Sequence, residues 1–428
     1  MITTNISLSA ALCYFSDGLS QQLAIEKMQR LWLILATLTL ARMTMGFQFQ
    51  SVAAVGPVLT ADSILTHTEL GVLIGAYLLP GALFAIPGGW FAKRFGDKRV
   101  VLTGLAMMTL GGALLALSEA YEIMFAGRLI SGLGAVLLNV LVTKMVTDWF
   151  AEHRITTAMG ILISSWPLGI AIALLTIGPL EETIGLKLTF FVPVALCAIA
   201  LLLIATIYTS PPESNEVATV SNESSVGKLT GYELWGVVLS GCVWCLYNSA
   251  LILTLSFGSE FLITKGITLT SAGAIVSLTS WLIIPALPLG AWIAERIGRP
   301  VSTMVVTFIA IAILIWMIPF TSFYLVIFAA LGIIFGPAGG LIMALPGQVL
   351  SKENRAVGMG IFFTIYYLGM GVFPGLAGYV RDITGDPAAP LILAGVAILF
   401  AVPALAGTRM VRIRQAKIKG VSVDVTGS

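Results

Sequence analysis

Apolar and polar stretches alternate regularly along this chain. Twelve apolar segments, most of them long enough to span a bilayer, are separated by short polar turns. A spanning helix needs roughly 20 apolar residues. The predicted helices are 31–59, 68–92, 99–118, 123–147, 156–178, 186–208, 230–257, 268–293, 301–320, 323–347, 356–379 and 388–408. The pattern therefore predicts an all-α integral membrane protein with twelve transmembrane helices.

One polar stretch divides this pattern in two. Residues 210–228, SPPESNEVATVSNESSVGK, are too polar and too rich in Pro, Ser and Glu to form a core element. They predict a central loop between two six-helix halves, residues 29–209 and 229–408, followed by a basic tail, 409–428. Residues 1–28 lack a basic region ahead of their short apolar part, so they make a poor signal peptide. We interpret them as an N-terminal tail, either disordered or the product of a misassigned start codon.

The composition agrees with a membrane protein and excludes several other classes. Of the 428 residues, 58% are hydrophobic and only 10% are charged, whereas a soluble domain is about a quarter charged. The net charge of +2 gives no basis for nucleic-acid binding. Cys242 and Cys245 have C-x-x-C spacing but no second pair, so they predict neither a metal site nor a cofactor. The expected partners are the lipid bilayer and a small molecule, and the expected state is a monomer.

The basic residues predict an orientation. If the segment before the first helix is cytoplasmic and the helices alternate, most of the 23 Lys and Arg residues lie on the cytoplasmic side. Only Lys187, Lys265 and Arg381 lie on the other side. This asymmetry follows the positive-inside rule. It predicts a multi-pass protein of the bacterial cytoplasmic (inner) membrane, with both termini in the cytoplasm.

An internal repeat supports the division into halves. The stretch AKRFG at 92–96 follows the second predicted helix, and AERIG at 294–298 follows the eighth. RITTAMG at 154–160 follows the fourth, and RAVGMG at 355–360 follows the tenth. Two matches in equivalent loops at nearly the same offset indicate duplicated, pseudo-symmetric halves. Such repeats are typical of transporters whose binding site lies between the halves.

The basic turn after the second helix resembles a known motif. GGWFAKRFGDKR, residues 88–99, is similar to the loop motif G-x-x-x-D-R-x-G-R-[KR] of the major facilitator superfamily. The resemblance implies that fold and a gating role for the turn, whose acid is thought to latch the outward-open state. It makes Gly89 a packing residue, Arg94 and Gly96 the turn, and Lys98 and Arg99 the terminal cations. The gating set in both halves is Gly89, Lys93, Arg94, Gly96, Asp97, Lys98, Arg99, Glu295, Arg296 and Gly298.

The position of the acid in that motif holds Lys93, which is a departure from the family. A lysine cannot favour the positive end of a helix dipole as a carboxylate does. Three explanations remain open: Asp97 takes over, Glu295 of the second half matters more, or the latch is weak. The alternative is a cluster that serves only the positive-inside rule.

Two further stretches resemble family sequences. GRLISGLGA, residues 127–135, is similar to the family pattern R-x-x-x-G-x-G-A, whose Arg lies within the membrane. SSWPLG, residues 164–169, is similar to sequences of cyanate-permease and nitrate/nitrite-porter relatives. The drug-antiporter ending G-P-x-x-G-G is not evident, because Gly178 and Pro179 are followed by Leu-Glu-Glu.

Two arginines lie within predicted helices. Arg42 is near the middle of the first helix, and Arg128 is more than one turn inside the fourth. A buried cation is expensive in the bilayer and marks a functional site by default. No Asp or Glu lies deep in any predicted segment, so the compensating charge is expected to be an anionic cargo held by the guanidinium groups. Alternatively, each arginine bonds backbone carbonyls of a broken or hydrated helix.

Other polar and aromatic side chains are candidates to line the cavity. The resemblance places helices one, four, seven and ten around it. The predicted substrate-binding residues are Arg42, Gln48, Gln50, Arg128, Asn139, Trp244, Tyr247 and Asn248. For the amides the alternative is bonding between helices, and for Trp244 and Tyr247 it is packing or an interface anchor.

These observations favour a secondary transporter that moves a small organic or inorganic anion by rocking of the two halves. One alternative is an efflux pump for lipophilic compounds, which the Met- and aromatic-rich helices would suit. The other is a non-transporting membrane sensor or assembly factor of the same fold. No catalytic constellation or nucleotide-binding loop is present in the sequence, so we do not expect an enzyme.

Overall fold

The fold is described from a computed structural model, which covers residues 4–61, 63–84, 94–150, 154–210, 229–351 and 353–419. The first half contains α1 (Thr4–Ala54), α2 (Gly56–Ala61), α3 (His67–Ala76), α4 (Gly81–Phe84), α6 (Asp97–Leu117), α7 (Tyr121–Phe150), α8 (Ile155–Ile184) and α9 (Leu186–Ile207). The second half contains α10 (Gly231–Thr264), α11 (Leu269–Ile297), α12 (Pro300–Met317), the 3-10 turn η1 (Ile318–Phe320), α13 (Tyr324–Val349), α14 (Arg355–Thr384) and α15 (Ala389–Lys419). Among the described residues, 12 helical spans are long and apolar enough to cross a membrane, which confirms the predicted fold class.

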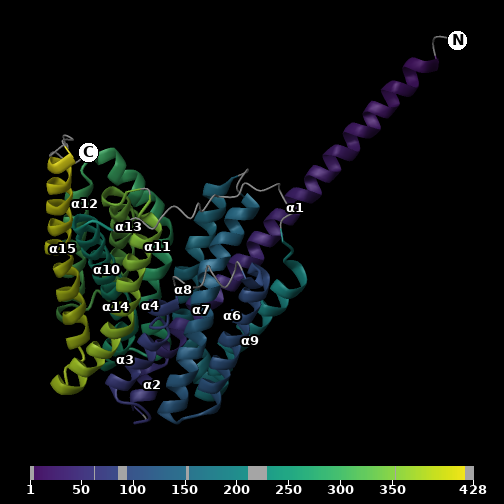
Figure 1. Cartoon of the computed structure of the whole chain (residues 1–428). Helices are drawn as coiled ribbons and strands as arrows, with labels where there is room; N and C mark the ends of the chain where they lie inside the picture. Colours follow the sequence, from purple (N-terminus) through teal and green to yellow (C-terminus); the bar gives the residue numbers. More distant parts are fainter. Residues whose placement is uncertain are drawn as a thin grey trace.

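Three boundaries differ from the sequence pattern. Helix α1 begins at Thr4, so it includes most of the predicted tail, and its N-terminal part projects from the bundle in Figure 1. The second predicted helix is interrupted by a turn at residues 77–80, where Pro80 has no amide hydrogen to donate. Helix α10 continues to Thr264, beyond the predicted end at residue 257, and therefore includes Glu260.

The helices form two bundles that contact each other mainly through two helix pairs. In the first bundle α1 packs against α8, and α6 packs against α7 and α9. In the second bundle α10 packs against α15, and α11 packs against α13. Across the bundles, α3 packs against α14 and α8 packs against α11. Figure 1 shows the purple-to-teal first half beside the green-to-yellow second half. These two cross-half pairs are equivalent under the internal repeat of the two halves.

Glycines allow these cross-half pairs to approach closely. A β-carbon added at Gly71 of α3 would collide with the Pro374 carbonyl of α14, and one added at Gly75 would collide with the Gly371 carbonyl. In the other pair, a β-carbon at Gly273 of α11 would collide with a carbonyl of α8. Small residues are what membrane helices use where their backbones touch. The contact between the halves therefore depends on backbone packing at these positions.

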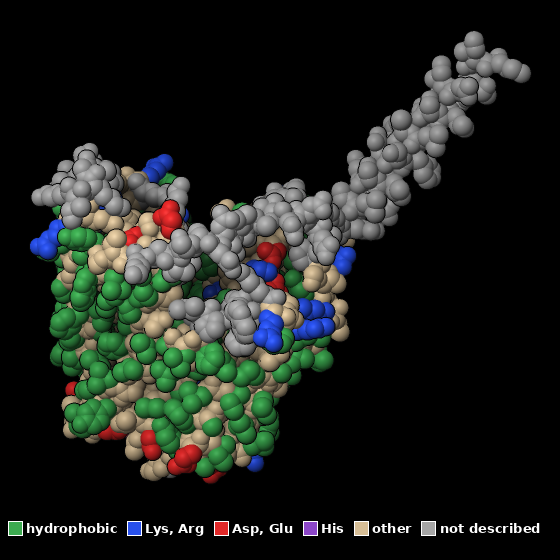
Figure 2. Space-filling model, in the orientation of Figure 1, with side chains coloured by type: hydrophobic (Ala, Val, Ile, Leu, Met, Phe, Trp, Pro, Cys, Tyr) green, Lys and Arg blue, Asp and Glu red, His purple; other side chains and the backbone are tan. Residues whose placement is uncertain are grey.

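The two ends of the bundle differ in charge. Figure 2 shows a band of hydrophobic side chains between an end where Lys and Arg gather and an end where Asp and Glu gather. We call them the basic end and the acidic end. From their positions at the helix ends, the basic end includes Lys98, Arg99, Arg299, Arg412 and Arg414, and the acidic end includes Glu119, Glu122, Glu182, Asp382 and Asp386. The surface is hollowed between the halves at the basic end in Figure 2.

Candidate functional site

Arg42 lies on α1 at the side that faces the second half, and it is partly exposed. Its Nε donates to Asn139 Oδ1 over 2.8 Å, and its Nη1 donates to the carbonyls of Leu162 (2.6 Å) and Ile163 (3.2 Å). Nη1 is also 3.5 Å from Ser165 Oγ. Within the described part of the chain, Nη2 has no hydrogen-bond partner. The guanidinium is thus held by neutral groups and keeps one donor edge available.

A proline explains why α8 offers carbonyls to Arg42. Pro167 lies inside α8 and has no amide hydrogen, so the carbonyl of Ile163, four residues earlier, loses its usual helical donor. That carbonyl is one of the acceptors used by Arg42. The proline therefore creates an acceptor within the membrane, where an unsatisfied carbonyl would be costly.

Tyrosines of the second half face this arginine. Tyr366 and Tyr367 of α14 both lie close enough to Arg42 to act on it electrostatically. The Tyr367 side chain also interacts with Asn139, and its ring packs against Gly81. The two tyrosine rings are 4.9 Å apart between centroids. Arg42 and Asn139 of one half therefore meet Tyr366 and Tyr367 of the other.

Trp244 extends this aromatic surface. Its ring centroid is 6.1 Å from that of Tyr366, 5.7 Å from Tyr247 and 6.4 Å from Phe362. Tyr247 is buried and donates its hydroxyl to the Phe335 carbonyl of α13. Asn248 donates to the Trp244 carbonyl within its own helix. Of the three candidates on α10, Trp244 lies next to Tyr366, whereas the hydrogen bonds of the other two stay inside the second half.

Arg128 occupies a different environment. It is 2% exposed, and its Nε, Nη1 and Nη2 donate to the carbonyls of Leu73, Gln48 and Phe49 over 2.9, 2.9 and 3.1 Å. Its guanidinium carbon lies 4.5 Å from the centre of the Tyr77 ring. All three nitrogens are therefore used to join α7 to α1 and α3. Arg128 and Arg42 share no hydrogen-bond acceptor, so the two arginines belong to separate sites.

The two candidate glutamines of α1 are both buried. Gln48 donates to the Met108 carbonyl over 2.9 Å and accepts from the Tyr77 hydroxyl over 3.3 Å, so it belongs to the same first-half network as Arg128. Gln50 donates across the halves to the Leu255 carbonyl over 3.3 Å. Its Oε1 has no partner in the part of the chain that the structure describes.

The candidate gating turn makes contacts within its own half. Gly89 and Lys93 lie outside the described residues. Asp97 forms an ion pair with Lys144 of α7, and Lys98 donates to the carbonyls of Ala205 (2.8 Å) and Tyr208 (2.7 Å) at the end of α9. The Arg94 guanidinium lies 5.6 Å from the centre of the Phe95 ring, and Arg99 is exposed. These contacts tie α6 to its own bundle at the open, basic end.

The equivalent turn in the second half has similar geometry. Gly96 and Gly298 both adopt positive φ, +84° and +65°, which is why glycine stands at the same place in each repeat. Arg296 lies 4.5 Å from the centre of the Trp292 ring. Glu295 lies on α11, and its side chain is outside the described part.

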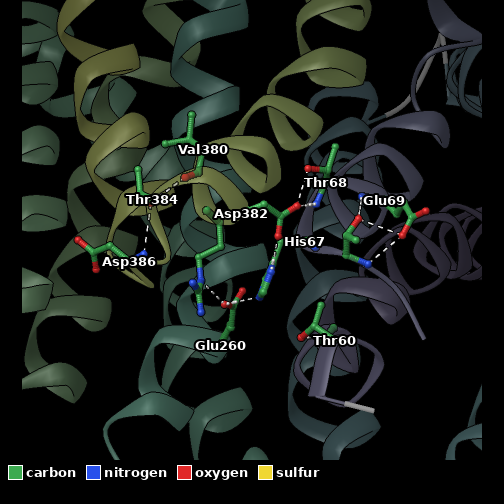
Figure 3. A network of polar contacts seen from close by, with 12 residues as sticks. Thr60, His67, Thr68, Glu69, Glu260, Val380, Asp382, Thr384 and Asp386 are labelled. Atoms are coloured by element: carbon green, nitrogen blue, oxygen red, sulfur yellow. Dashed lines mark hydrogen bonds and ion pairs between the residues drawn. The ribbon is translucent and has the colours of Figure 1, made fainter. Parts of the chain in front are cut away.

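Sequence reasoning missed a charged cluster at the acidic end, drawn in Figure 3. Its members are His67 of α3, Glu260 of α10, and Arg381 and Asp382 of α14. His67 Nδ1 is 2.7 Å from Asp382 Oδ1, and its Nε2 is 3.1 Å from Glu260 Oε1. Arg381 Nε donates to the same Glu260 oxygen over 2.8 Å. The cluster joins the two halves opposite the hollowed end.

A capping box positions this cluster. Thr66 accepts from the amide of Glu69, and the Glu69 carboxylate accepts from the amide of Thr66, so α3 begins at His67. The first amides of a helix have no partner inside it. Those of His67 and Thr68 instead donate to Asp382 over 3.2 and 2.8 Å. The T-x-x-E pattern at 66–69 was a readable signal for the helix start, but not for its partner.

Comparisons with known proteins agree with this architecture. The family model described as Major Facilitator Superfamily matches residues 38–265 and 234–422. A hexuronate transporter of Bacillus subtilis is 25% identical over 85% of this chain and 90% of its own length. The inner membrane transport protein YajR of Escherichia coli is 28% identical over 76% of this chain and 73% of its own. A solved structure of the nucleoside transporter NupG shares the fold, with a TM-score of 0.69 at 14% identity, over 89% of this chain and 99% of that one.

Proposed function

Because the chain belongs to the Major Facilitator Superfamily, a family of multi-pass membrane transporters, we propose that it is a secondary transporter of a small organic anion. The observation that carries the proposal is the environment of Arg42. Its guanidinium lies between the halves and has only neutral partners among the described residues. A cation in the membrane needs compensation, and a carboxylate on the cargo would supply it by accepting charge-assisted hydrogen bonds from the available Nη2 group of Arg42.

The surroundings of Arg42 suggest the rest of the cargo. Tyr366, Tyr367 and Trp244 give a continuous aromatic surface with hydroxyl groups, which suits a small polar ring better than an inorganic ion. The similarity to a hexuronate transporter supports a carboxylate that carries hydroxyl groups. A sugar acid is therefore our first candidate within this class.

We also propose the orientation and the conformational cycle. The concentration of Lys and Arg at one end supports a cytoplasmic position for that end under the positive-inside rule. The present arrangement, joined at the acidic end and hollowed at the basic end, then corresponds to an inward-open state. Rocking of the halves about the Arg42 region would open the acidic end.

Thermal stability of the purified protein tests the anion directly. We expect sugar acids to raise the midpoint of unfolding and the matched neutral sugars to leave it unchanged, because only a bound ligand stabilises the folded state. Arg42→Ala should weaken binding about 10- to 100-fold, since one charged hydrogen bond contributes about 1.5–3 kcal/mol. Arg414→Ala is the matched control, because Arg414 is exposed at the basic end and lies outside the gating set.

The outcome that would overturn the proposal is equally specific. Equal stabilisation of the wild-type protein by sugar acids and neutral sugars, or undiminished anion binding in Arg42→Ala, would remove Arg42 from the cargo site. Stabilisation by inorganic oxyanions alone, lost in Arg42→Ala, would keep the site and correct the class of cargo.

A smaller loss of anion affinity is expected when Tyr367 is replaced by phenylalanine. Tyr367→Phe keeps the ring but removes the hydroxyl that reaches Asn139 across the halves. Asn139 then loses a partner that helps to hold Arg42. Anion affinity should fall about 2- to 10-fold, the usual range for one neutral hydrogen bond. Tyr379→Phe, at an exposed position of the same helix, serves as the control in the same titration.

A further inference from the structure

The charged cluster at the acidic end is built from groups that are far apart in the sequence. His67 comes from the first half, whereas Glu260, Arg381 and Asp382 come from the second (Figure 3). Each contact of His67 with a carboxylate therefore crosses between the halves. These contacts can exist only while the acidic end is closed.

Asp382 is surrounded by donors. Its Oδ1 accepts from the amide of His67 over 3.2 Å, and its Oδ2 accepts from the amide and the hydroxyl of Thr68 over 2.8 and 2.5 Å. The positive end of the α3 dipole adds to this environment. Asp382 is therefore an ionised acceptor, and the ring nitrogen 2.7 Å from it, His67 Nδ1, must carry a hydrogen.

The second ring nitrogen of His67, Nε2, also faces a carboxylate that can only accept a hydrogen bond. Glu260 Oε1 already accepts from Arg381 Nε over 2.8 Å, so this carboxylate is paired with a permanent cation. His67 Nε2 lies 3.1 Å from the same oxygen. Each ring nitrogen of His67 therefore faces an acceptor. The ring can donate a hydrogen bond to both acceptors only when it is protonated, as an imidazolium. The cluster then holds two cations and two anions and is neutral.

We propose that His67 is a proton-binding site that fills when the acidic end closes and empties when it opens. The proposal rests on the alternating access of the proposed function. In the closed state the proton is held by Glu260 and Asp382. Once the halves separate, the imidazole faces water without these acceptors and holds its proton less tightly. The proton is thus taken up from, and returned to, the medium at the acidic end.

Other charged groups around α3 do not replace His67 in this role. The groups that act on it electrostatically are Glu260, Asp382 and Arg381. On α3 itself, Glu69 is engaged by Thr66 in the capping box. Glu122, at the start of the neighbouring α7, is exposed. His67 is therefore the group of this cluster whose ordinary pKa, about 6.5, lies near neutrality.

The second contact between the halves lacks such a group. Glu182 of α8 accepts from the amide and hydroxyl of Thr270 of α11 over 3.4 and 2.9 Å. This contact of a carboxylate with hydroxyl and amide donors contains no imidazole, the side chain that exchanges a proton near neutrality. This contact can hold the end closed but does not respond to pH there. It supplies a matched control.

The sign of the effect follows from linkage. The closed state binds one more proton than the open state, so lowering the pH favours closure. Because a single proton is exchanged, the ratio of closed to open molecules changes by at most about tenfold per pH unit. A steeper dependence would require a second titrating group.

Distances between spin labels at the acidic end test the proposal without any substrate. Glu119 and Ser322 are exposed in equivalent turns of the two halves and are suited to labelling after Cys13, Cys197, Cys242 and Cys245 are replaced. In the full-length protein in nanodiscs, we expect the wild-type distance distribution to shift toward short distances as the pH falls from about 8.5 to about 5.5.

Variants at both contacts distinguish the outcomes. His67→Gln should favour the long distance and lose the pH response, whereas His67→Arg should favour the short distance and also lose it. Glu182→Gln should weaken closure but keep the response. A wild-type distribution that does not change with pH, or a His67→Gln protein that titrates like the wild type, would overturn the proposal. Because no substrate is present, failure of the anion assay does not affect this test.

Discussion

Replacing Arg128 by lysine is expected to destabilise the protein strongly, and more than replacement by methionine does. Arg128 is buried, and its three nitrogens donate to carbonyls on two other helices. A lysine keeps the buried charge but cannot direct a planar fork at three acceptors. The loss should be about 3–5 kcal/mol, the range for a buried charge deprived of its partners. Methionine leaves no charge to satisfy and fills similar volume, so it should cost less.

The measurement is the thermal midpoint of the three purified proteins in one detergent. The lysine variant should melt roughly 6–20 °C below the wild type, given about 2–4 °C per kcal/mol. Arg99→Lys, at an exposed position, should be neutral. The lysine variant could instead be as stable as the wild type, or more stable than the methionine variant. Either result would mean that the three hydrogen bonds from Arg128 to carbonyls do not account for its contribution to stability.

The sequence identified both buried arginines but could not separate their roles. Arg42 and Arg128 look alike as lone cations in apolar segments. The difference lies in the acceptors that surround them, and these come from residues far away in the chain. Pro167 was a readable sign that α8 exposes a carbonyl, yet nothing in the sequence pairs that carbonyl with Arg42. Whether a buried donor is used up is a property of tertiary packing.

The end of α10 illustrates a second limit of prediction from the sequence. Residues 258–264 begin Gly-Ser-Glu, which a hydropathy pattern interprets as the end of a span. The helix nevertheless continues to Thr264, because Glu260 is paired with Arg381 within the second half and with His67 across the interface. Hydropathy scores each residue for contact with lipid and cannot include an ion pair with a residue more than a hundred positions away. The same reason hid the whole acidic-end cluster.

Periodicity predicted the number and order of the spans because the bilayer imposes a length that apolar residues must fill. The turns of the repeat were also predictable, since Gly96 and Gly298 occupy equivalent positions and both require positive φ. What the pattern could not give is which end of the two bundles is closed. That depends on contacts such as His67 with Asp382, which are 315 residues apart.

Gly75→Val is expected to open the acidic end, and it is the strongest test that the present arrangement is one of two states. The added β-carbon would occupy the position of the Gly371 backbone on α14, and no side-chain movement can relieve that clash. The cost of overpacking is about 1–3 kcal/mol. It applies only when α3 and α14 are in contact, so the ratio of closed to open molecules should fall about 5- to 150-fold.

The label pair at Glu119 and Ser322 reports this shift as a gain in long distances, while the fold and the thermal midpoint stay near those of the wild type. Gly160→Ala is the matched control, because a β-carbon there meets nothing within 4 Å. Gly75→Val and His67→Gln act on the same contact by different means, one by size and one by charge. Gly75→Val keeps His67, so the label distance in the molecules that still close should continue to depend on pH. In His67→Gln this dependence should be lost. A Gly75→Val protein that stays closed would mean that α3 and α14 do not separate, and that the halves do not rock about this interface.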